Sequence, residues 1–293
     1  MKQSLTVIIP CKNERMNIRP CIESARRVAD EVLVADSGST DGTLDIIREM
    51  GGCRLIEREY VNSGDFKNWA IPQASHPWVL IVDSDERVTV ELAAEIDRLL
   101  SGTPRADGYH IYRANYFMGH RIRHSGWGRD KVLRLFRRDQ GRYVGQSDHA
   151  EVHVSSGRVG HLRARLEHFT YWSYDQYFRK FHRYTVQGAG NYRQRGKSAS
   201  YLKMLLSPPL RFLHCYIIRL GFLDGLAGLQ VSALTGMSSF VKQIRLWEME
   251  HALPQPDPEA SRQPGDHSKP HGGPKAPHWT ASVAQRSDSQ TSS

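Results

Sequence analysis

The sequence predicts an α/β fold built on an open, Rossmann-like and mostly parallel sheet, and three observations support this. Strand-like and helix-like segments alternate over the first hundred residues. Residues 78–82 form an unbroken apolar run with three β-branched side chains, as expected for a strand that is buried on both faces. Polar and acidic residues follow three of the predicted strands, at the edge where open α/β sheets bind ligands.

Each element of this first part has a local reason. Segments of apolar and β-branched residues predict strands at residues 5–9, 31–35, 54–57 and 78–82. Apolar residues at helical spacing predict helices at residues 18–28, 43–50, 66–74 and 90–100. Asn17, Thr40 and Thr89 precede three of these helices and are expected to act as N-caps.

The pattern changes after residue 108. Three strand-like segments follow with no helix between them, which predicts antiparallel additions to the same sheet: residues 109–113, 131–136 and 158–162. Residues 172–184 and 210–247 are then predicted to be helical, with a break at Pro208 and Pro209 before the second helical region.

The end of the chain has a different composition. Seven of the fourteen prolines lie after residue 251, among Ser, Gln, His and Gly, and apolar periodicity is absent, which predicts disorder. The chain is therefore expected to have an α/β domain at residues 1–170, C-terminal helices at 171–250 that are a candidate for membrane association, and a disordered tail at 251–293.

The formal net charge of +9 is concentrated in the second half of the chain. Between residues 158 and 219 there are twelve Lys or Arg residues and only two acids, so an anionic partner such as nucleic acid, a phosphorylated substrate or anionic lipid is expected. The four cysteines have no C-x-x-C spacing, so neither a zinc site nor a disulfide framework is predicted. The first residues lack a signal-peptide pattern, and a cytoplasmic protein is expected.

The strand ends favour one kind of nucleotide chemistry over others. The Gly-x-Gly-x-x-Gly and Walker patterns are missing, which argues against nicotinamide cofactors and P-loop chemistry. Asp83 and Asp85 emerge instead from the buried strand, and two carboxylates one residue apart can bind Mg²⁺ or Mn²⁺ while phosphate oxygens fill other positions. An isolated Asp-x-Asp is more often only a solvated turn that caps the next helix, so the neighbouring motifs have to decide.

Three strand ends carry, in chain order, PCKNE at 10–14, DSGSTDG at 36–42 and DSDE at 83–86. This ordered set resembles the family 2 glycosyltransferases, which share the GT-A fold. The resemblance implies that the first two loops hold a nucleotide sugar, and that Asp83 and Asp85 hold a divalent metal, Mg²⁺ or Mn²⁺, on its diphosphate. The residues implied for the nucleotide-sugar site are Pro10, Asn13, Glu14, Asp36, Asp41, Lys67, Asn68 and Asp83.

Later segments narrow the resemblance. LRLFR at 133–137, HFTY at 168–171 and GFLDGLAG at 221–228 resemble the bacterial subgroup that contains the lipopolysaccharide core glucosyltransferases. Those relatives show Val-His-Glu where this chain has Asp-His-Ala-Glu, so the implied general base is either Asp148 or Glu151. Glu151 is slightly favoured because it is the only glutamate beside the histidine.

The resemblance implies inverting, metal-dependent transfer of a sugar from a nucleotide-sugar donor to a hydroxyl of the lipopolysaccharide core or of another lipid-linked saccharide. Two alternatives stay open. One is a glycosyltransferase of capsule, exopolysaccharide or protein glycosylation. The other is a non-catalytic basic protein that binds membrane or nucleic acid, although the ordered carboxylates argue against it and no nucleic-acid partner is expected.

A membrane surface is the expected location. The longest uncharged run in the helical region, residues 225–241, has 17 residues, and a membrane span needs about 20 apolar residues. An interfacial helix pair flanked by Arg211, Arg219 and Lys242 is expected instead, because cations strengthen binding to anionic lipid. The alternative is that residues 210–247 pack on the first domain or on a second subunit. This interpretation predicts a protein that is peripheral to the inner face of the cytoplasmic membrane.

Overall fold

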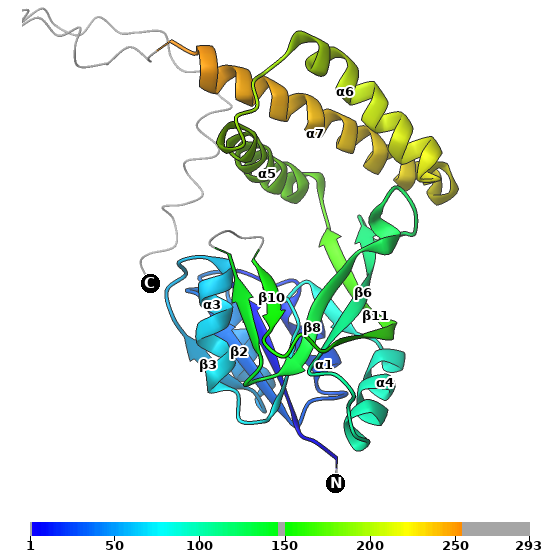
Figure 1. The fold of residues 1–293 in the computed structure, drawn as a ribbon. Helices are drawn as coiled ribbons and strands as arrows, with labels where there is room; N and C mark the ends of the chain where they lie inside the picture. The colour runs from blue at the N-terminus through cyan, green and yellow to red at the C-terminus, as the bar shows by residue number, and fades with distance from the viewer. Residues whose placement is uncertain (1, 146–149, 254–293) are drawn as a thin grey trace, which may run out of the picture. The chain divides into compact units, whose positions relative to one another are not determined.

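In the computed structural model, which describes residues 2–145 and 150–253, a nine-stranded sheet lies at the centre of the fold (Figure 1). Its main path runs β3-β2-β1-β4-β8-β6-β11-β5, and β7 pairs with β6 outside that path. The first four strands are β1 (Leu5–Cys11), β2 (Glu31–Asp36), β3 (Arg54–Glu57) and β4 (Trp78–Ile81). All pairings among them are parallel, so the fold class predicted from the sequence is confirmed.

The other half of the sheet is mixed. Its strands are β5 (Glu86–Val88), β6 (Gly108–Phe117), β7 (His120–Ile122), β8 (Lys131–Arg137) and β11 (Val159–Tyr171). As predicted, β8 runs antiparallel to its neighbours β4 and β6. The long strand β11, of 13 residues, runs antiparallel to β5 as predicted, but the prediction is wrong for its other neighbour, β6, with which it pairs in parallel.

A separate hairpin explains the direction of β11. Strands β9 (Gly141–Val144) and β10 (Glu151–Val154) pair antiparallel in a small sheet of their own. The amide of Ser155, after β10, donates to the carbonyl of Gln140, before β9, so the hairpin returns the chain to the point where β8 ends. From there β11 starts in the direction opposite to β8, and this direction is parallel to β6.

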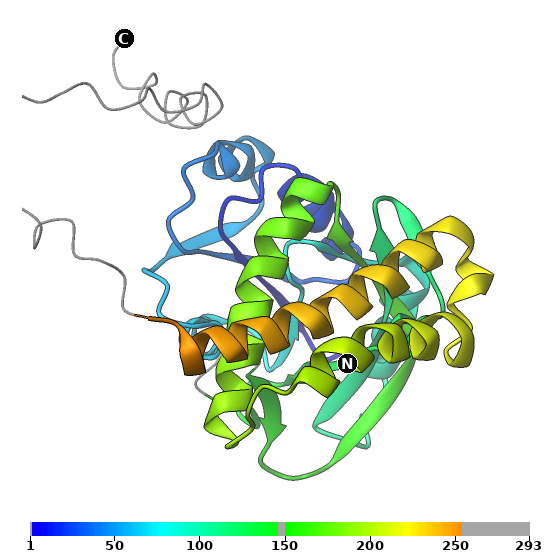
Figure 2. The same cartoon turned by 90° about the horizontal axis from the view of Figure 1, so that it is seen from above.

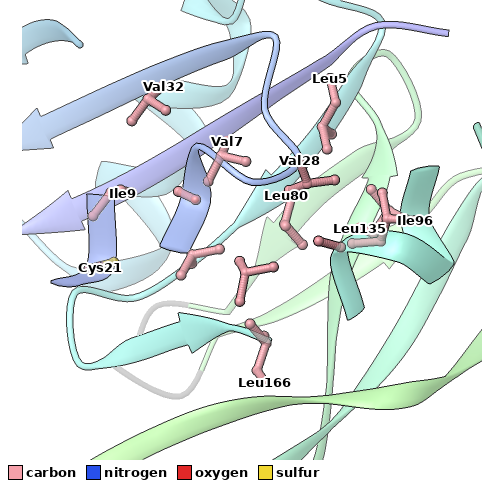
Figure 3. Close-up of a cluster of buried hydrophobic side chains, with 14 of the residues drawn as sticks. Leu5, Val7, Ile9, Cys21, Val28, Val32, Leu80, Ile96, Leu135 and Leu166 are labelled. Carbon is pink, nitrogen blue, oxygen red and sulfur yellow. The ribbon is translucent and has the colours of Figure 1, made fainter. Parts of the chain in front are cut away.

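Helices cover both faces of the parallel part. They are α1 (Ile18–Ala25), α2 (Thr43–Met50), α3 (Ser63–Ala70) and α4 (Val90–Ser101). The larger core cluster joins α1 and α4 to the sheet face that carries Val7 and Leu80 (Figure 3). A second cluster joins α3 to the face that carries Ile81. Each fully buried Leu or Ile in these clusters contributes about 1.5–3 kcal/mol, so the core fixes where the strand ends lie.

Thr89 caps α4 as predicted, because its hydroxyl accepts the Leu92 amide (3.1 Å). Asn17 does stand at the N-cap position of α1, but its side chain forms no capping bond. Its Oδ1 accepts instead from Arg87 (3.1 Å) and from the indole N–H of Trp172 (2.9 Å). Tertiary contacts therefore displace the local capping bond that the sequence predicted.

Two other helix starts differ from the prediction. Thr40 does not cap α2, whose N-cap is Gly42 in the left-handed region (φ 90°), a conformation that favours glycine. The helix predicted at residues 66–74 begins earlier, because Asn62 Oδ1 accepts the Asp65 amide (2.9 Å) and caps α3. A short 3₁₀ turn, Ile71–Gln73, follows the end of α3.

Helices form the rest of the described chain, as Figure 2 shows from above. They are α5 (Tyr174–Gln194), α6 (Tyr201–Leu213), the π-helical turn η3 (His214–Ile218), the 3₁₀ turn η4 (Gly221–Asp224) and α7 (Gly225–His251). The predicted break at Pro208 and Pro209 is wrong, since both lie inside α6. The carbonyls that lose their helical partners there belong to Met204 and Leu205, on a helix with no buried residues, where water can satisfy them.

One carboxylate joins the C-terminal helices to the sheet. Asp224 of η4 accepts the amides of Arg123 (3.1 Å) and His124 (2.8 Å), and its Oδ1 lies 2.9 Å from His124 Nδ1. In α7, Gly236 lets α6 approach closely, because a Cβ there would meet the Pro208 carbonyl at 2.8 Å. No single described helix passes a length and hydropathy test for a membrane span; Tyr201–Ile218 and Gly221–His251 pass it only as a pair bent by 72°.

Candidate active site

The predicted carboxylates stand in a tight turn between β4 and β5. The Glu86 amide donates to the Asp83 carbonyl (2.7 Å), and the Asp83 amide donates in return to the Glu86 carboxylate (3.0 Å). Glu86 itself is fully buried. These reciprocal bonds fix the turn, so Asp83 and Asp85 are held at the carboxyl edge of the parallel strands.

Two buried cations neutralise Asp83. Lys67 Nζ, from α3, lies 2.9 Å from Oδ1, and Arg134, from β8, forms an ion pair with Oδ2. Burial alone would raise the pKa of Asp83, but Arg134 and Lys67 outweigh it and hold the pKa well below its usual range. Burial lowers the pKa of Lys67, and the Asp83 charge overcomes this and raises it. The pair is therefore ionised on both sides.

Asp85 faces His168 of β11 and Lys180 of α5. Its Oδ2 lies 3.7 Å from His168 Nε2 and 3.5 Å from Lys180 Nζ. Burial raises the pKa of Asp85, but His168 and Lys180 together lower it to about 2. Both contacts are longer than a strong charged hydrogen bond, so the Asp85 oxygens keep the capacity to bind another ligand.

The hydrogen bonds of His168 define its tautomer. Asn115 donates through Nδ2 to the Trp127 carbonyl (2.9 Å) and to Asp130 (3.1 Å), so its Oδ1 is the atom that lies 2.6 Å from His168 Nδ1. Nδ1 therefore carries a proton, and Nε2 is the ring nitrogen that lies toward Asp85. An imidazole nitrogen beside a carboxylate is a donor set that suits an ion such as Mn²⁺.

The metal expected from the sequence thus fits Asp85 and His168 better than Asp83. Both oxygens of Asp83 are engaged by Lys67 and Arg134. Within residues 2–145 and 150–253, no group of three or more His, Cys, Asp and Glu side chains is arranged to hold a metal ion. Phosphate oxygens of a bound donor would have to complete the coordination.

The two loops predicted to hold the nucleotide are joined by hydrogen bonds. The Asn13 amide donates to Ser39 Oγ (2.8 Å), and Asn13 Oδ1 accepts the Thr40 amide (2.8 Å). The Glu14 amide donates to Thr43 Oγ1 (2.9 Å). Asn13 adopts a left-handed backbone conformation (φ 54°), which asparagine tolerates better than most residues. The two loops therefore meet at one edge of the sheet.

Asp36 and Asp41 hold their own loop in shape. Buried Asp36 accepts the amides of Gly38 and Ser39 (2.8 Å each), and Asp41 accepts the amide two residues further on (3.0 Å). Pro10 lies half-buried near the end of β1. A direct contact of these three residues with a nucleotide stays a prediction, because the bonds that the structure gives to the two carboxylates organise the loop.

Lys67 and Asn68 have separate tasks. Lys67 reaches Asp83, whereas Asn68 binds the backbone of Tyr143 in β9 twice, by donating to its carbonyl (2.9 Å) and by accepting from its amide (2.8 Å). The helix that supplies the cation therefore also anchors the hairpin β9–β10, which leads to the predicted base.

The two candidates for the base lie in this hairpin. Glu151 opens β10 and is exposed. The hairpin passes close to the start of α3, since a Cβ on Gly64 would lie 2.8 Å from the Ala150 Cβ. No contact within the described chain joins Glu151 to the donor-site carboxylates. Asp148 lies outside the described residues, and the choice between the two carboxylates stays open.

Sequence reasoning missed three charged residues of this site. The sequence could have pointed to Arg134, because an arginine between apolar residues of a strand needs a buried partner. In the structure its partners are Asp83 and Glu86. Glu86 was read only as part of the motif, and it also contacts Arg113 (3.4 Å). Lys180 carried no local signal, since its partner Asp85 lies far away in the chain.

Comparison with known proteins agrees with this geometry. Residues 6–177 match the model of glycosyl transferase family 2. The chain is 30% identical over 259 residues to the lipopolysaccharide core biosynthesis glycosyltransferase LpsC of Rhizobium meliloti, covering 86% of this chain and 94% of that protein. It is 26% identical over 259 residues to an uncharacterized glycosyltransferase of Rickettsia typhi, covering 85% and 88%.

Among solved structures, a mannosyltransferase of Pyrobaculum calidifontis in complex with GDP-Man and Mn²⁺ matches with a TM-score of 0.49 at 17% identity, over 86% of this chain and 89% of that one. The family match and the long alignment with LpsC are the decisive findings, and they confirm the resemblance seen in the three strand-end loops. The chain belongs to glycosyl transferase family 2.

Proposed function

We propose that this glycosyltransferase moves a sugar from a nucleotide-diphosphate sugar to a hydroxyl of a lipopolysaccharide core or other lipid-linked saccharide, with inversion at the anomeric carbon. The observation that carries the proposal is the meeting of the two joined loops with Asp83 and Asp85 at one sheet edge. The choice of acceptor is supported by the similarity to LpsC and by the excess of cations in the second half of the chain.

A single displacement fits these residues. The acceptor hydroxyl gives its proton to a carboxylate, Glu151 or Asp148, as its oxygen attacks the anomeric carbon. The bond from that carbon to the diphosphate breaks, and negative charge builds on the leaving oxygens. Lys67 and Lys180 lie beside the two carboxylates where the diphosphate is expected, so their ammonium groups oppose that charge.

A divalent ion, Mg²⁺ or Mn²⁺, would supply further positive charge to the diphosphate when bound. Asp85 and His168 are the residues proposed to hold it, because Asp85 Oδ2 and His168 Nε2 lie only 3.7 Å apart and neither is engaged by a strong hydrogen bond to the other. Asp83 then acts mainly by keeping Lys67 and Arg134 in place. This assignment differs from the sequence expectation, which gave Asp83 and Asp85 as the metal pair.

The C-terminal helices are proposed to bind the cytoplasmic face of an anionic membrane. Large apolar side chains that are more than half exposed lie along α6, η3 and η4. They are Leu202, Leu205, Leu210, Ile217, Ile218 and Leu223. An apolar groove of about 880 Å³ lies between α6 and α7. From residue 201 to 247 there are five Lys or Arg and one acid, Asp224, whose side chain is buried against His124. Anionic lipid would satisfy both the apolar surface and the unbalanced charge.

The proposed function is tested by a transfer assay with purified protein, a panel of nucleotide sugars and truncated lipopolysaccharide cores. We expect the enzyme to accept only one of the nucleotide sugars as donor. EDTA should stop transfer, and Mn²⁺ or Mg²⁺ should restore it. Asp85→Asn serves as the matched inactive control. Donor hydrolysis without transfer to any core would contradict the proposed acceptor, and equal transfer by Asp85→Asn would contradict the proposed site.

A further inference from the structure

A second pocket, of about 220 Å³, lies between β6, β7, β11 and the turn η2 (Trp127–Arg129). Four arginines contribute to its lining: Arg113, Arg121, Arg123 and Arg165. The transfer mechanism above uses none of them. Several guanidinium groups around one small cavity repel one another unless an anion lies among them, so the composition of the pocket points to a ligand.

Two of these arginines are fixed by the protein. Arg113 forms an ion pair with Asp130 (2.7 Å). Arg165 donates from one nitrogen to the carbonyls of Arg113 and Gly128 (3.2 Å each), and no ion pair engages it within the described residues. Arg165 is therefore held in position by neutral groups while its charge stays uncompensated, which is what a preorganised anion site requires.

The other two arginines, Arg121 and Arg123, are uncompensated like Arg165. Arg121 ends up on the same face as Arg123, because buried Ile122 lies between them and alternate residues of a strand point to opposite faces. Neither side chain forms an ion pair or a hydrogen bond within residues 2–145 and 150–253, and both are exposed. The Arg123 amide is anchored to the Asp224 carboxylate (3.1 Å), so the backbone beneath these charges is fixed.

We propose that this arginine pocket binds a phosphomonoester carried by the acceptor saccharide. A phosphomonoester has a charge of about −1.5 to −2 and three acceptor oxygens, and guanidinium groups bind it with two parallel hydrogen bonds. The pocket is smaller than the roughly 300–1,000 Å³ that a larger ligand such as a nucleotide sugar needs. A carboxylate would leave more of the positive charge uncompensated than a phosphomonoester does.

The position of the pocket places it beside the donor site. Arg113 lies 3.4 Å from Glu86, Glu86 lies 3.1 Å from Arg134, and Arg134 pairs with Asp83. Two buried side chains, Glu86 and Arg134, thus separate the pocket residue Arg113 from the donor carboxylate Asp83. The inference rests on the proposed function, since a phosphate at this distance from the donor site would belong to the acceptor that is being extended.

The first experiment asks whether the pocket binds phosphate. Inorganic phosphate is titrated by calorimetry into the wild type, the double variant Arg121→Gln/Arg123→Gln, and the control Arg98→Gln/Arg105→Gln, which removes two exposed arginines elsewhere. Any phosphate that binds at the donor site should bind equally in all three proteins. The difference in phosphate affinity between them therefore measures binding in the arginine pocket. The pocket variant should lose at least about tenfold in affinity for one site, as expected for lost charged hydrogen bonds. Equal affinities in all three would overturn the proposal.

The second experiment asks whether that phosphate belongs to the acceptor. Transfer is measured on core saccharide before and after phosphatase treatment. The wild type should show a KM for the acceptor about tenfold higher after treatment, with kcat little changed, whereas the pocket variant should show the higher KM with both acceptors. Weakened phosphate binding beside an unchanged KM would mean an adventitious ion only and would overturn the assignment. Absence of transfer by the wild type to either acceptor would refute the proposed acceptor and its link to the pocket, while the titration would still decide whether the phosphate site exists.

Discussion

Lys180 of α5 lies 3.5 Å from the carboxylate of Asp85, so the helical region that follows the sheet contributes a cation to the donor site. The Lys180 ammonium is held from behind by the Thr170 carbonyl (3.4 Å) and lies 5.4 Å from the centre of the Tyr171 ring. Because α5 also leads to the proposed membrane surface, this one helix connects that surface to the proposed donor site.

Lys180→Met should lower kcat/KM for the donor by on the order of 10- to 100-fold, since it removes one ammonium group from the leaving diphosphate. Its melting temperature should change little, because Lys180 is partly exposed. The control is Arg179→Met, which changes the exposed neighbour on the same helix. Steady-state kinetics on both variants make the comparison, and equal losses would argue against a specific role of Lys180.

The neutral variants of Asp83 and Asp85 should lose different properties: Asp83→Asn should lose folding stability, and Asp85→Asn should lose transfer activity. Asp83→Asn leaves Lys67 and Arg134 without a carboxylate that both share, so we expect the free energy of unfolding to fall by about 3 kcal/mol or more. Asp85→Asn removes longer contacts and should fold normally, yet lose transfer. Urea unfolding combined with the transfer assay separates the two effects. A fully stable Asp83→Asn would show that the ion pairs do not act as described.

The identity of the base is decided by two variants in single-turnover kinetics with saturating donor, metal and acceptor. Glu151→Gln keeps the shape and most hydrogen bonding but loses the basic oxygen, so the chemical step should slow by about 10² to 10⁴. Asp148→Asn should then show a much smaller loss. The reverse result would assign the role to Asp148, and wild-type rates in both would place the base elsewhere.

The membrane surface is tested by flotation with vesicles of phosphatidylcholine and phosphatidylglycerol. Leu205→Asp/Ile218→Asp places two carboxylates on the exposed apolar side of α6 and η3 and should reduce vesicle binding at least about tenfold. Val61→Asp/Val90→Asp makes the same change at exposed apolar positions elsewhere and should leave binding intact. Equal binding by all proteins, or binding indifferent to lipid charge and salt, would contradict the proposal.

Glu31 should make stability depend on pH. Burial raises its pKa, but hydrogen bonds from Thr6 (2.6 Å), Ser75 (2.8 Å) and Arg54 (2.8 Å) outweigh burial and lower it from 4.5 to about 2. Because the folded pKa lies below the unfolded one, the stability that Glu31 contributes is present above about pH 4.5 and is lost as the pH falls toward 2. Glu31→Gln should cost up to about 3 kcal/mol at pH 7. In urea unfolding, the gap to wild type should narrow from pH 5 to pH 3.

The parallel half of the fold could be predicted because its signals are local. Apolar runs ending in polar loops located β1, β2 and β4, and the order of those loops identified the family. The direction of β11 could not be predicted, because it depends on the hairpin β9–β10, whose closure is a contact between distant residues. The prolines of α6 were misread for a similar reason, since solvent exposure of that helix is a tertiary property.

In the candidate active site, too, local features could be predicted from the sequence, and contacts between distant residues could not. Sequence placed Asp83, Asp85 and Lys67 close together, and the structure joins Lys67 to Asp83 directly. It could not show that Asn68 faces away to hold β9, or that His168 rather than any other histidine reaches Asp85. Such assignments depend on which side chains a fold brings together across the chain, and sequence spacing holds no information on them.

The donor site carries its own counter-ions at rest, because Asp83 and Asp85 are already matched with Lys67, Arg134 and Lys180. Under the proposed function, donor binding would be an exchange of partners, in which the cations turn from carboxylate to phosphate, and a divalent ion bound with the donor would offset the added charge of the diphosphate. When the nucleoside diphosphate leaves, the carboxylates recover their cations at once. A site arranged in this way avoids an unbalanced buried charge in the empty enzyme and favours release of the charged product at the end of each cycle.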